Sequence, residues 1–266
     1  MFVVGIARLA GPLQDEAPLL AADLGMTAYD ARLLLAPGLP AIVLLTPDKG
    51  RALDLLAKVR GRGHDALAFD TQAVIPSESM VRPRQLTLHD EGLTSGDPNP
   101  EHLRFVDIFL LLRTTHETSS EASHHTTKKE FSASRAVLTG GLVVRKKTTE
   151  TSTTHAYGKL DVLYLYPRAG QRPWLLQETG TRYVGLGDRL AATERANFLT
   201  TVELIRSHAS GAAYDDRLVG RKIPERLAQF TIQTLGVSDT RVSSSTASAM
   251  DLLCHFVAMW HSKQAG

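Results

Sequence analysis

The chain has 266 residues, long enough to bury a substantial core and to divide into two domains. Its 30 Lys and Arg residues nearly balance its 28 Asp and Glu residues, which argues against the concentrated basic face of a nucleic-acid-binding protein. The single cysteine, Cys254, excludes an internal disulfide and a cysteine-rich zinc module. The first apolar run is too short for a signal peptide, and no window holds the about 18 apolar residues of a spanning helix. We therefore expect a soluble, cytoplasmic protein.

The first 75 residues alternate short apolar runs with helical patterns. We predict strands at 2–7, 40–45 and 64–69, and helices from about 15, from 27 to 35 and from 48 to 61. The last helix is the clearest, because Ala52, Leu55 and Val59 recur on one face and Asp48 stands where an N-cap belongs. The order is β-α-α-β-α-β, which we assign to a small domain over residues 1–75.

This domain resembles the C-terminal domain of the large-subunit ribosomal stalk protein, a fold shared with the small adaptor of the Clp protease. The stretches that carry the resemblance are FVV (2–4), LGMTAYDARLLLAPGLP (24–40) and RALDLLAKVRGRGHDALAF (51–69). The lysine-rich face of that family is mostly absent here. The resemblance thus implies a protein-docking fold without implying binding to translation factors.

Residues 76–84 lack periodicity and are bounded by prolines, which predicts a linker. Strand patterns follow in a second domain over 85–235, and the continuous run DIFLLL (107–112) predicts a strand buried on both faces. A helix is expected at 193–208, and the polar stretch 211–227 is expected to pack loosely. The segments RQLTLHDEGL (84–93) and RFVDIFLLLR (104–113) make residues 84–210 similar to bacterial pleckstrin-homology-like domains. That resemblance implies a topology and supplies no binding residues.

Two Thr-rich segments, TTHETSSEASHHTTKK (114–129) and RKKTTETSTTHAYGK (145–159), adjoin predicted core strands. Threonine favours strands, and polar residues on both faces exclude a membrane-spanning hairpin. In one arrangement the segments form a solvated two-stranded ribbon with an apolar tip; in the other, AVLTGGLVV (136–144) is a core hairpin and the Thr-rich segments are edge strands or loops. For the ribbon, the predicted interaction residues are Lys128, Lys129, Phe131, Val137, Leu138, Leu142, Val143, Arg145, Lys146 and Lys147.

The C-terminal stretch AMDLLCHFVAMW (249–260) predicts an apolar helix over 249–263, behind a flexible spacer at 236–248. Such a helix packs on its own domain or binds a partner groove. Its candidate interaction residues are Leu252, Leu253, Phe256 and Trp260.

No catalytic, cofactor or metal pattern stands out, so we predict no cofactor and no catalytic residue. The adjacent His124 and His125 would point to opposite faces of a strand, so they cannot share one metal ion. His116 and His124 would lie on one face but far apart, and a site would need His155 opposite one of them together with a carboxylate. Asp215 and Asp216 beside Arg217 are interpreted as a surface ion-pair site.

Taken whole, the sequence predicts an α+β protein and resembles bacterial proteins of unassigned activity. We interpret it as a non-enzymatic interaction or assembly protein, a scaffold or adaptor, that self-associates or docks a protein partner through the ribbon. The alternative is a peripheral membrane protein that binds lipid headgroups through its basic, apolar-tipped hairpin.

Overall fold

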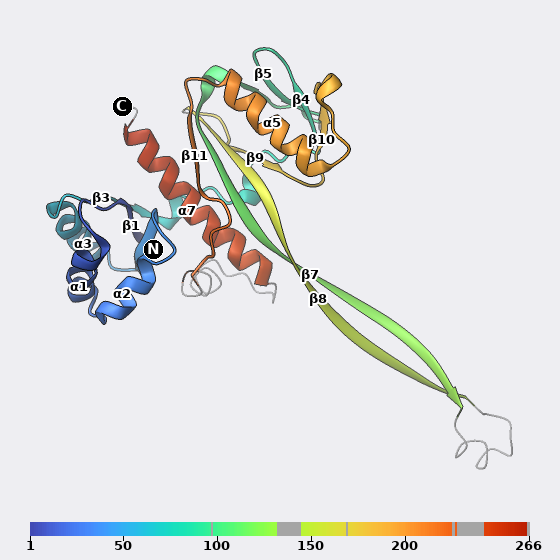
Figure 1. The fold of residues 1–266 in the computed structure, drawn as a ribbon, viewed down its shortest axis with the longest axis horizontal. Coiled ribbons are helices and arrows are strands. Elements are labelled where there is room, and N and C mark those ends of the chain that lie inside the picture. Colours follow the sequence, from blue (N-terminus) through green and yellow to red (C-terminus); the bar gives the residue numbers. More distant parts are fainter. Residues whose placement is uncertain (97, 132–144, 169, 225–226, 228–241, 265–266) are drawn as a thin grey trace. The chain divides into compact units, whose positions relative to one another are not determined.

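The computed structural model describes residues 1–96, 98–131, 145–168, 170–224, 227 and 242–264 (Figure 1). The described residues form an α+β fold without a closed barrel. They divide into two compact units, one of residues 1–116 with 160–266 and one of residues 117–159. The predicted fold class is confirmed, whereas the resemblances to the stalk-protein and pleckstrin-homology-like folds stay predictions.

The N-terminal part has the predicted β-α-α-β-α-β order. Its elements are β1 (Phe2–Arg8), α1 (Leu13–Leu24), α2 (Ala28–Leu35), β2 (Ala41–Thr46), α3 (Lys49–Gly61) and β3 (Asp65–Asp70). The central strand β1 pairs antiparallel with both β2 and β3. Helix α2 begins where the Thr27 hydroxyl accepts the Asp30 N–H, and α3 begins where Asp48 accepts the Arg51 N–H. These local signals explain why the sequence predicted this part well.

The predicted linker at 76–84 is packed into the protein. Val81 forms a β-bridge to Trp174, and both Met80 and Val81 are buried. After it come β4 (Gln85–Leu88), β5 (Gly92–Ser95) and β6 (His102–Arg104), which with β10 (Arg182–Val184) form a sheet in the order β10-β4-β5-β6.

The other four-stranded sheet contains the two longest strands. Its order is β11-β7-β8-β9, with β7 (Ile108–Phe131), β8 (Arg145–Pro167), β9 (Trp174–Gln177) and β11 (Ala213–Leu218). Strand β11 corrects the expectation that 211–227 packs loosely, because it pairs parallel with β7 and buries Asp215 and Leu218. The helices α5 (Glu194–His208) and α7 (Val242–Gln264) complete the fold.

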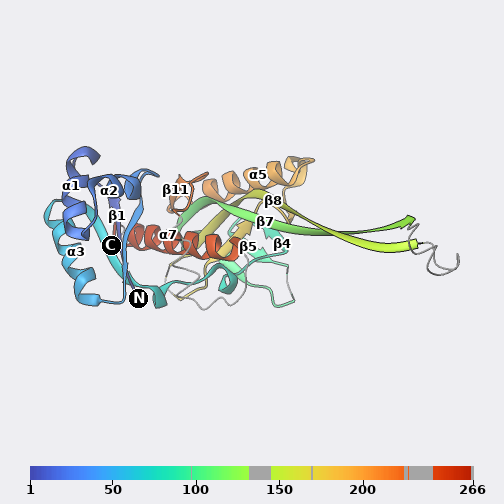
Figure 2. The same ribbon diagram turned by 90° about the horizontal axis from the view of Figure 1, so that it is seen from below.

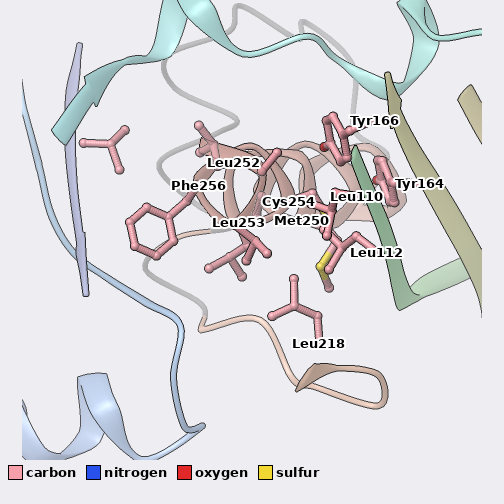
Figure 3. Close-up of a cluster of buried hydrophobic side chains, with 14 of the residues drawn as sticks. Leu110, Leu112, Tyr164, Tyr166, Leu218, Met250, Leu252, Leu253, Cys254 and Phe256 are labelled. Atoms are coloured by element: carbon pink, nitrogen blue, oxygen red, sulfur yellow. The ribbon is translucent and has the colours of Figure 1, made fainter. Parts of the chain in front are cut away.

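The two faces of this sheet bury separate cores, as the DIFLLL pattern predicted. Leu110 and Tyr164 pack with α7 on one face, while Leu111 and Leu163 pack with α5 and the other sheet. Figure 2 shows α5 and α7 on opposite sides of β7 and β8. The core on the α7 side also includes Val3 and other residues of the N-terminal sheet, so α7 contributes to a core shared by both ends of the chain (Figure 3).

The predicted spacer at 236–248 is partly helical. Helix α7 begins at Val242 and includes residues 242–248, while residues 236–241 lie outside the described part. Residues 242–248 contain no glycine or proline, so they can continue a helix whose following residues are held by packing in the core. No helix of the described residues is long and apolar enough to cross a membrane.

Candidate functional site

Strands β7 and β8 continue beyond the strands that flank them. β11 pairs with β7 from Leu110 to Thr114, and β9 pairs with β8 from Val162 to Leu165. Among the described residues, no strand pairs with the outer edge of β7 after Thr114 or of β8 before Val162. We call residues 117–131 of β7 and 145–159 of β8 the ribbon. A strand edge without a partner exposes backbone N–H and C=O groups, which can accept a further strand.

Two threonines of β7 form hydrogen bonds with the end of β11 and with the turn that follows it. The Thr114 hydroxyl donates to the Leu218 carbonyl oxygen at 3.1 Å. The Thr115 hydroxyl accepts the Gly220 N–H at 2.9 Å. Gly220 has a φ of 68°, a conformation that favours glycine, so the chain turns away from the sheet at this point. The outer edge of β7 therefore loses its partner because of a specific turn.

A charged cluster joins β7 and β8 at the same level. The Asp161 carboxylate of β8 lies 2.6 Å from Arg113 Nη2 and accepts the Thr115 hydroxyl at 3.0 Å. Arg195 of α5 lies 3.7 Å from Asp161 and 3.5 Å from Glu178. A buried carboxylate is tolerated when it is paired and hydrogen-bonded in this way. The cluster thus fixes the register of the two strands next to the ribbon.

A second polar network lies in the core on the α7 side. Tyr164 donates its hydroxyl proton to Asp251 Oδ1 at 2.7 Å, and His116 Nε2 lies 2.9 Å from the same hydroxyl. The Ser77 N–H donates to Asp251 Oδ2 at 2.8 Å. The network therefore connects β7, β8, α7 and the segment before β4, four parts of the chain that are distant in sequence.

Burial shifts the titration of both ends of this network. It raises the pKa of Asp251 to about 6, although the hydrogen bonds from Ser77 and Tyr164 lower it. It also lowers the pKa of His116 to about 4, and the Arg82 charge adds to this effect. His116 is consequently neutral at pH 7, and Asp251 is mostly ionised.

The network is enclosed by apolar residues. Tyr164, Cys254 and Asp251 expose at most 2% of their surface. Burial raises the pKa of the Cys254 thiol well above its usual value, so the reactive thiolate is suppressed. These groups have no access to a substrate in this structure, and their geometry supports a structural role.

The structure distinguishes between the two alternatives for the C-terminal helix and places it on its own chain. Leu252, Leu253 and Phe256 are buried in the core of their own chain (Figure 3), and Trp260 is partly buried with the Arg217 guanidinium 4.9 Å from its ring centre. The Phe256 ring packs directly on Gly5 of β1. The apolar pattern of this helix reflects packing within the chain, which the sequence left as one of two alternatives.

The other predicted interaction residues belong to the ribbon or to the segment that joins its strands. Lys128, Lys129 and Phe131 are part of β7, and Arg145, Lys146 and Lys147 are part of β8. The Thr-rich segments therefore continue the two central strands of a sheet and are neither separate edge strands nor loops. The side chains of these six residues, and Val137, Leu138, Leu142 and Val143 altogether, lie outside the described residues.

The predicted ion pair of Asp215 with Arg217 is present, and Asp216 is exposed, but the prediction that Asp215 lies on the surface is wrong. Asp215 is only 5% exposed, and its carboxylate accepts hydrogen bonds from Arg217 at 2.6 Å and from His261 at 3.0 Å. Although burial raises the pKa of Asp215, these hydrogen bonds hold it well below its usual range. His261 lies one helical turn beyond Val257, so the sequence indicated which face of the C-terminal helix it occupies. Its partner Asp215 could not be inferred, because strand β11 was not predicted.

The histidines are not gathered into a metal site in the part of the chain that is described. No group of three or more metal-ligating side chains occurs there, and the His116 ring is engaged by Tyr164. His124, His125 and His155 lie in the ribbon strands, and their side chains are outside the described residues.

The comparisons with known proteins give no family. No family model matches the chain, and no significant match occurs among curated proteins or solved structures.

Proposed function

We propose that this protein is a non-enzymatic, cytoplasmic interaction protein that binds a protein partner, a second copy of itself included, along the edges of the ribbon. The observation that carries the proposal is the length of β7 and β8, 24 and 23 residues, against the short strands that flank them. An isolated two-stranded ribbon is marginally stable in water, and a further strand on its edge satisfies its free backbone groups. The Thr-rich composition favours strand structure without requiring burial.

The unit outside the ribbon has the features of a scaffold that holds it. The Asp161 cluster and the Asp251 network both tie β7 to β8 through buried, hydrogen-bonded side chains. Their neighbours are the two apolar cores on either face of the sheet. A rigid base reduces the entropy that a docking strand must overcome.

The test removes the ribbon and keeps its base. A variant in which an Asn-Gly turn replaces residues 117–159 retains the whole first unit, with both cores. Sedimentation velocity over a range of concentrations should show that the intact protein associates and that the variant is a monomer. Thermal unfolding should show the same midpoint for both proteins. A control variant, Val106→Ser, alters a side chain that is 73% exposed and should associate like the intact protein.

Two outcomes would contradict the proposal. If the intact protein is a monomer and captures no strand-forming partner, the edges are not a docking site. If it floats with anionic vesicles and the ribbon-deleted variant does not, the lipid-binding alternative is preferred.

A further inference from the structure

A buried histidine, His64, joins three segments of the N-terminal part. It lies between the end of α3 and the start of β3, and only 6% of its surface is exposed. Its Nδ1 atom accepts the backbone N–H of Ala10, in the turn between β1 and α1, at 2.9 Å. Its Nε2 atom lies 2.7 Å from Oε2 of Glu16, a residue of α1 that is 4% exposed. The ring therefore connects the β1–α1 turn, helix α1 and the α3–β3 turn.

The contact with Ala10 fixes the tautomer of the His64 ring. A backbone N–H can only donate, so the Nδ1 atom that accepts it carries no proton. The proton of the neutral ring is then on Nε2, beside Glu16, although the Glu16 oxygen lies away from the line of an ideal hydrogen bond. A second proton, on Nδ1, would place two donors opposite each other. The hydrogen bond to Ala10 therefore exists only while the ring is neutral.

The charges around the ring act on its other side. The Glu16 carboxylate contacts both Arg62, at 2.7 Å, and His64. An ionised imidazole attracts a carboxylate more strongly than a neutral one does. Protonation would thus keep the ring on Glu16 while it breaks the bond to Ala10. The remaining charged groups near the ring are paired with one another or with Arg62, and they are Asp23 of α1 and Lys58 of α3, and Arg8 of β1 with Asp65 of β3.

The β1–α1 turn depends on this contact. Pro12 is the N-cap of α1 and provides no side-chain hydrogen bond to the start of the helix. Among the described residues, the Ala10 N–H has no acceptor besides His64. Gly63, with a φ of 85°, brings the α3–β3 turn so close that a Cβ atom there would lie 3.3 Å from the Cβ of Ala10. The two turns are therefore in contact, and His64 supplies the directed bond between them.

We propose that His64 is an acid-sensitive latch for the β1–α1 turn. With a neutral ring the latch is closed on Ala10; a proton on Nδ1 opens it, while Nε2 stays beside Glu16. Histidine is the side chain that ordinarily gains its second proton between about pH 8 and 5, so mild acidification is the signal. The turn and the start of α1 gain freedom when the latch opens. This latch lies outside the ribbon, and the proposal does not depend on the proposed function.

Hydrogen exchange of single amides, followed by NMR on the full-length protein, tests the latch. The protection factor of the Ala10 amide, taken relative to the unfolded chain at each pH, should fall about tenfold or more between pH 8 and pH 5. The Met26 amide, which donates to the Ala21 carbonyl oxygen at 3.0 Å, is the control and should keep its protection factor. Long-range proton–nitrogen correlation at pH 8 should place the ring proton of His64 on Nε2.

Two substitutions separate the two ring nitrogens. His64→Asn puts an amide oxygen where Nδ1 lies, and an amide does not titrate, so Ala10 should be protected equally at both pH values. His64→Gln puts its amide near the position of Nε2 and offers Ala10 no acceptor, so Ala10 should be unprotected at both. Urea unfolding midpoints show whether each variant is folded, and the two measurements on the unaltered protein stand without them.

Equal protection of Ala10 at both pH values in the unaltered protein would overturn the latch. A ring proton found on Nδ1 at pH 8 would overturn it as well. A parallel loss of protection at Met26 would show that acid unfolds the whole N-terminal part and would reject a local latch. If Ala10 loses protection with falling pH in a folded His64→Asn variant too, then a group other than His64 controls the turn.

Discussion

The hydrogen-bonded chain His116–Tyr164–Asp251 predicts an unusual dependence of stability on pH. The pKa of His116 lies near 4 in the folded protein, against 6.5 as its ordinary value, and the pKa of Asp251 lies near 6 against 3.8. As the pH falls from 6.5 to 4, the unfolded chain gains a proton on His116, while the folded chain gains one on Asp251. The two states therefore take up similar numbers of protons over this interval.

The two contributions have opposite signs. The stability that neutral His116 provides is complete above pH 6.5 and is lost as the pH falls toward 4. The stability that protonated Asp251 provides is complete below pH 3.8 and is lost as the pH rises through 6. The lowered pKa of His116 and the raised pKa of Asp251 each correspond to about 3 kcal/mol of unfolding free energy over the full titration. Their sum over this range is close to zero. The pair should therefore add almost no pH dependence to the free energy of unfolding of the unaltered protein.

Single substitutions separate the two contributions. His116→Gln leaves Asp251 alone, and the free energy of unfolding should fall by about 2 kcal/mol as the pH rises from 4 to 6. Asp251→Asn leaves His116 alone, and stability should fall by about 3 kcal/mol as the pH falls from 6.5 to 4. Urea unfolding followed by tryptophan fluorescence at a series of pH values measures both slopes. His89→Gln, which alters an exposed histidine, should give a curve parallel to that of the unaltered protein.

The outcome that would refute this reasoning is a pair of variants whose curves both run parallel to that of the unaltered protein. In that case His116 and Asp251 titrate in the folded protein as they do in the unfolded chain, and water reaches the network.

Two further predictions concern packing and buried charge. A Cβ atom on Gly5 would lie 2.7 Å from the buried Phe256 ring, so Gly5→Ala should destabilise by about 1–3 kcal/mol in urea unfolding, with partial recovery in the double variant with Phe256→Leu. Gly11→Ala, with no atom within 4 Å of the added carbon, is the control; an equal loss there would show that the loss at Gly5 does not come from contact with Phe256. Glu16→Gln removes the charge that lies 2.7 Å from Arg62 in a nearly buried site and should cost about 2 kcal/mol, measured in the same way. A change below about 0.5 kcal/mol would show that water screens this pair.

Much of the N-terminal part was predictable because its signals are local. Thr27 and Asp48 lie at the helix starts where their side chains cap the backbone, and Gly25 ends α1 with a φ of 70°. Such caps act within one turn of helix, so a single sequence contains all the information that they need.

Strand β11 shows why other parts were not predictable. Its sequence, AYDDRL, is polar and contains adjacent acidic residues, so its hydrophobic pattern predicts a loop. It is a strand because it pairs with Leu110–Thr114 of β7, and Asp215 is buried because Arg217 and His261 neutralise it. Tertiary partners override weak local preference, and they come from distant parts of the chain.

The sequence by itself determined the order of elements in residues 1–70, the burial of the DIFLLL run (107–112) on both faces and the strand preference of the Thr-rich segments. Only the tertiary structure decided that α7 packs on its own chain, that Asp251 is joined to Tyr164 and His116, and that Asp215 is buried against Arg217 and His261. The physical reason is that periodicity and capping depend on neighbours within a few residues. The environment of a buried charge depends instead on which distant residues surround it, and only the packed chain defines these.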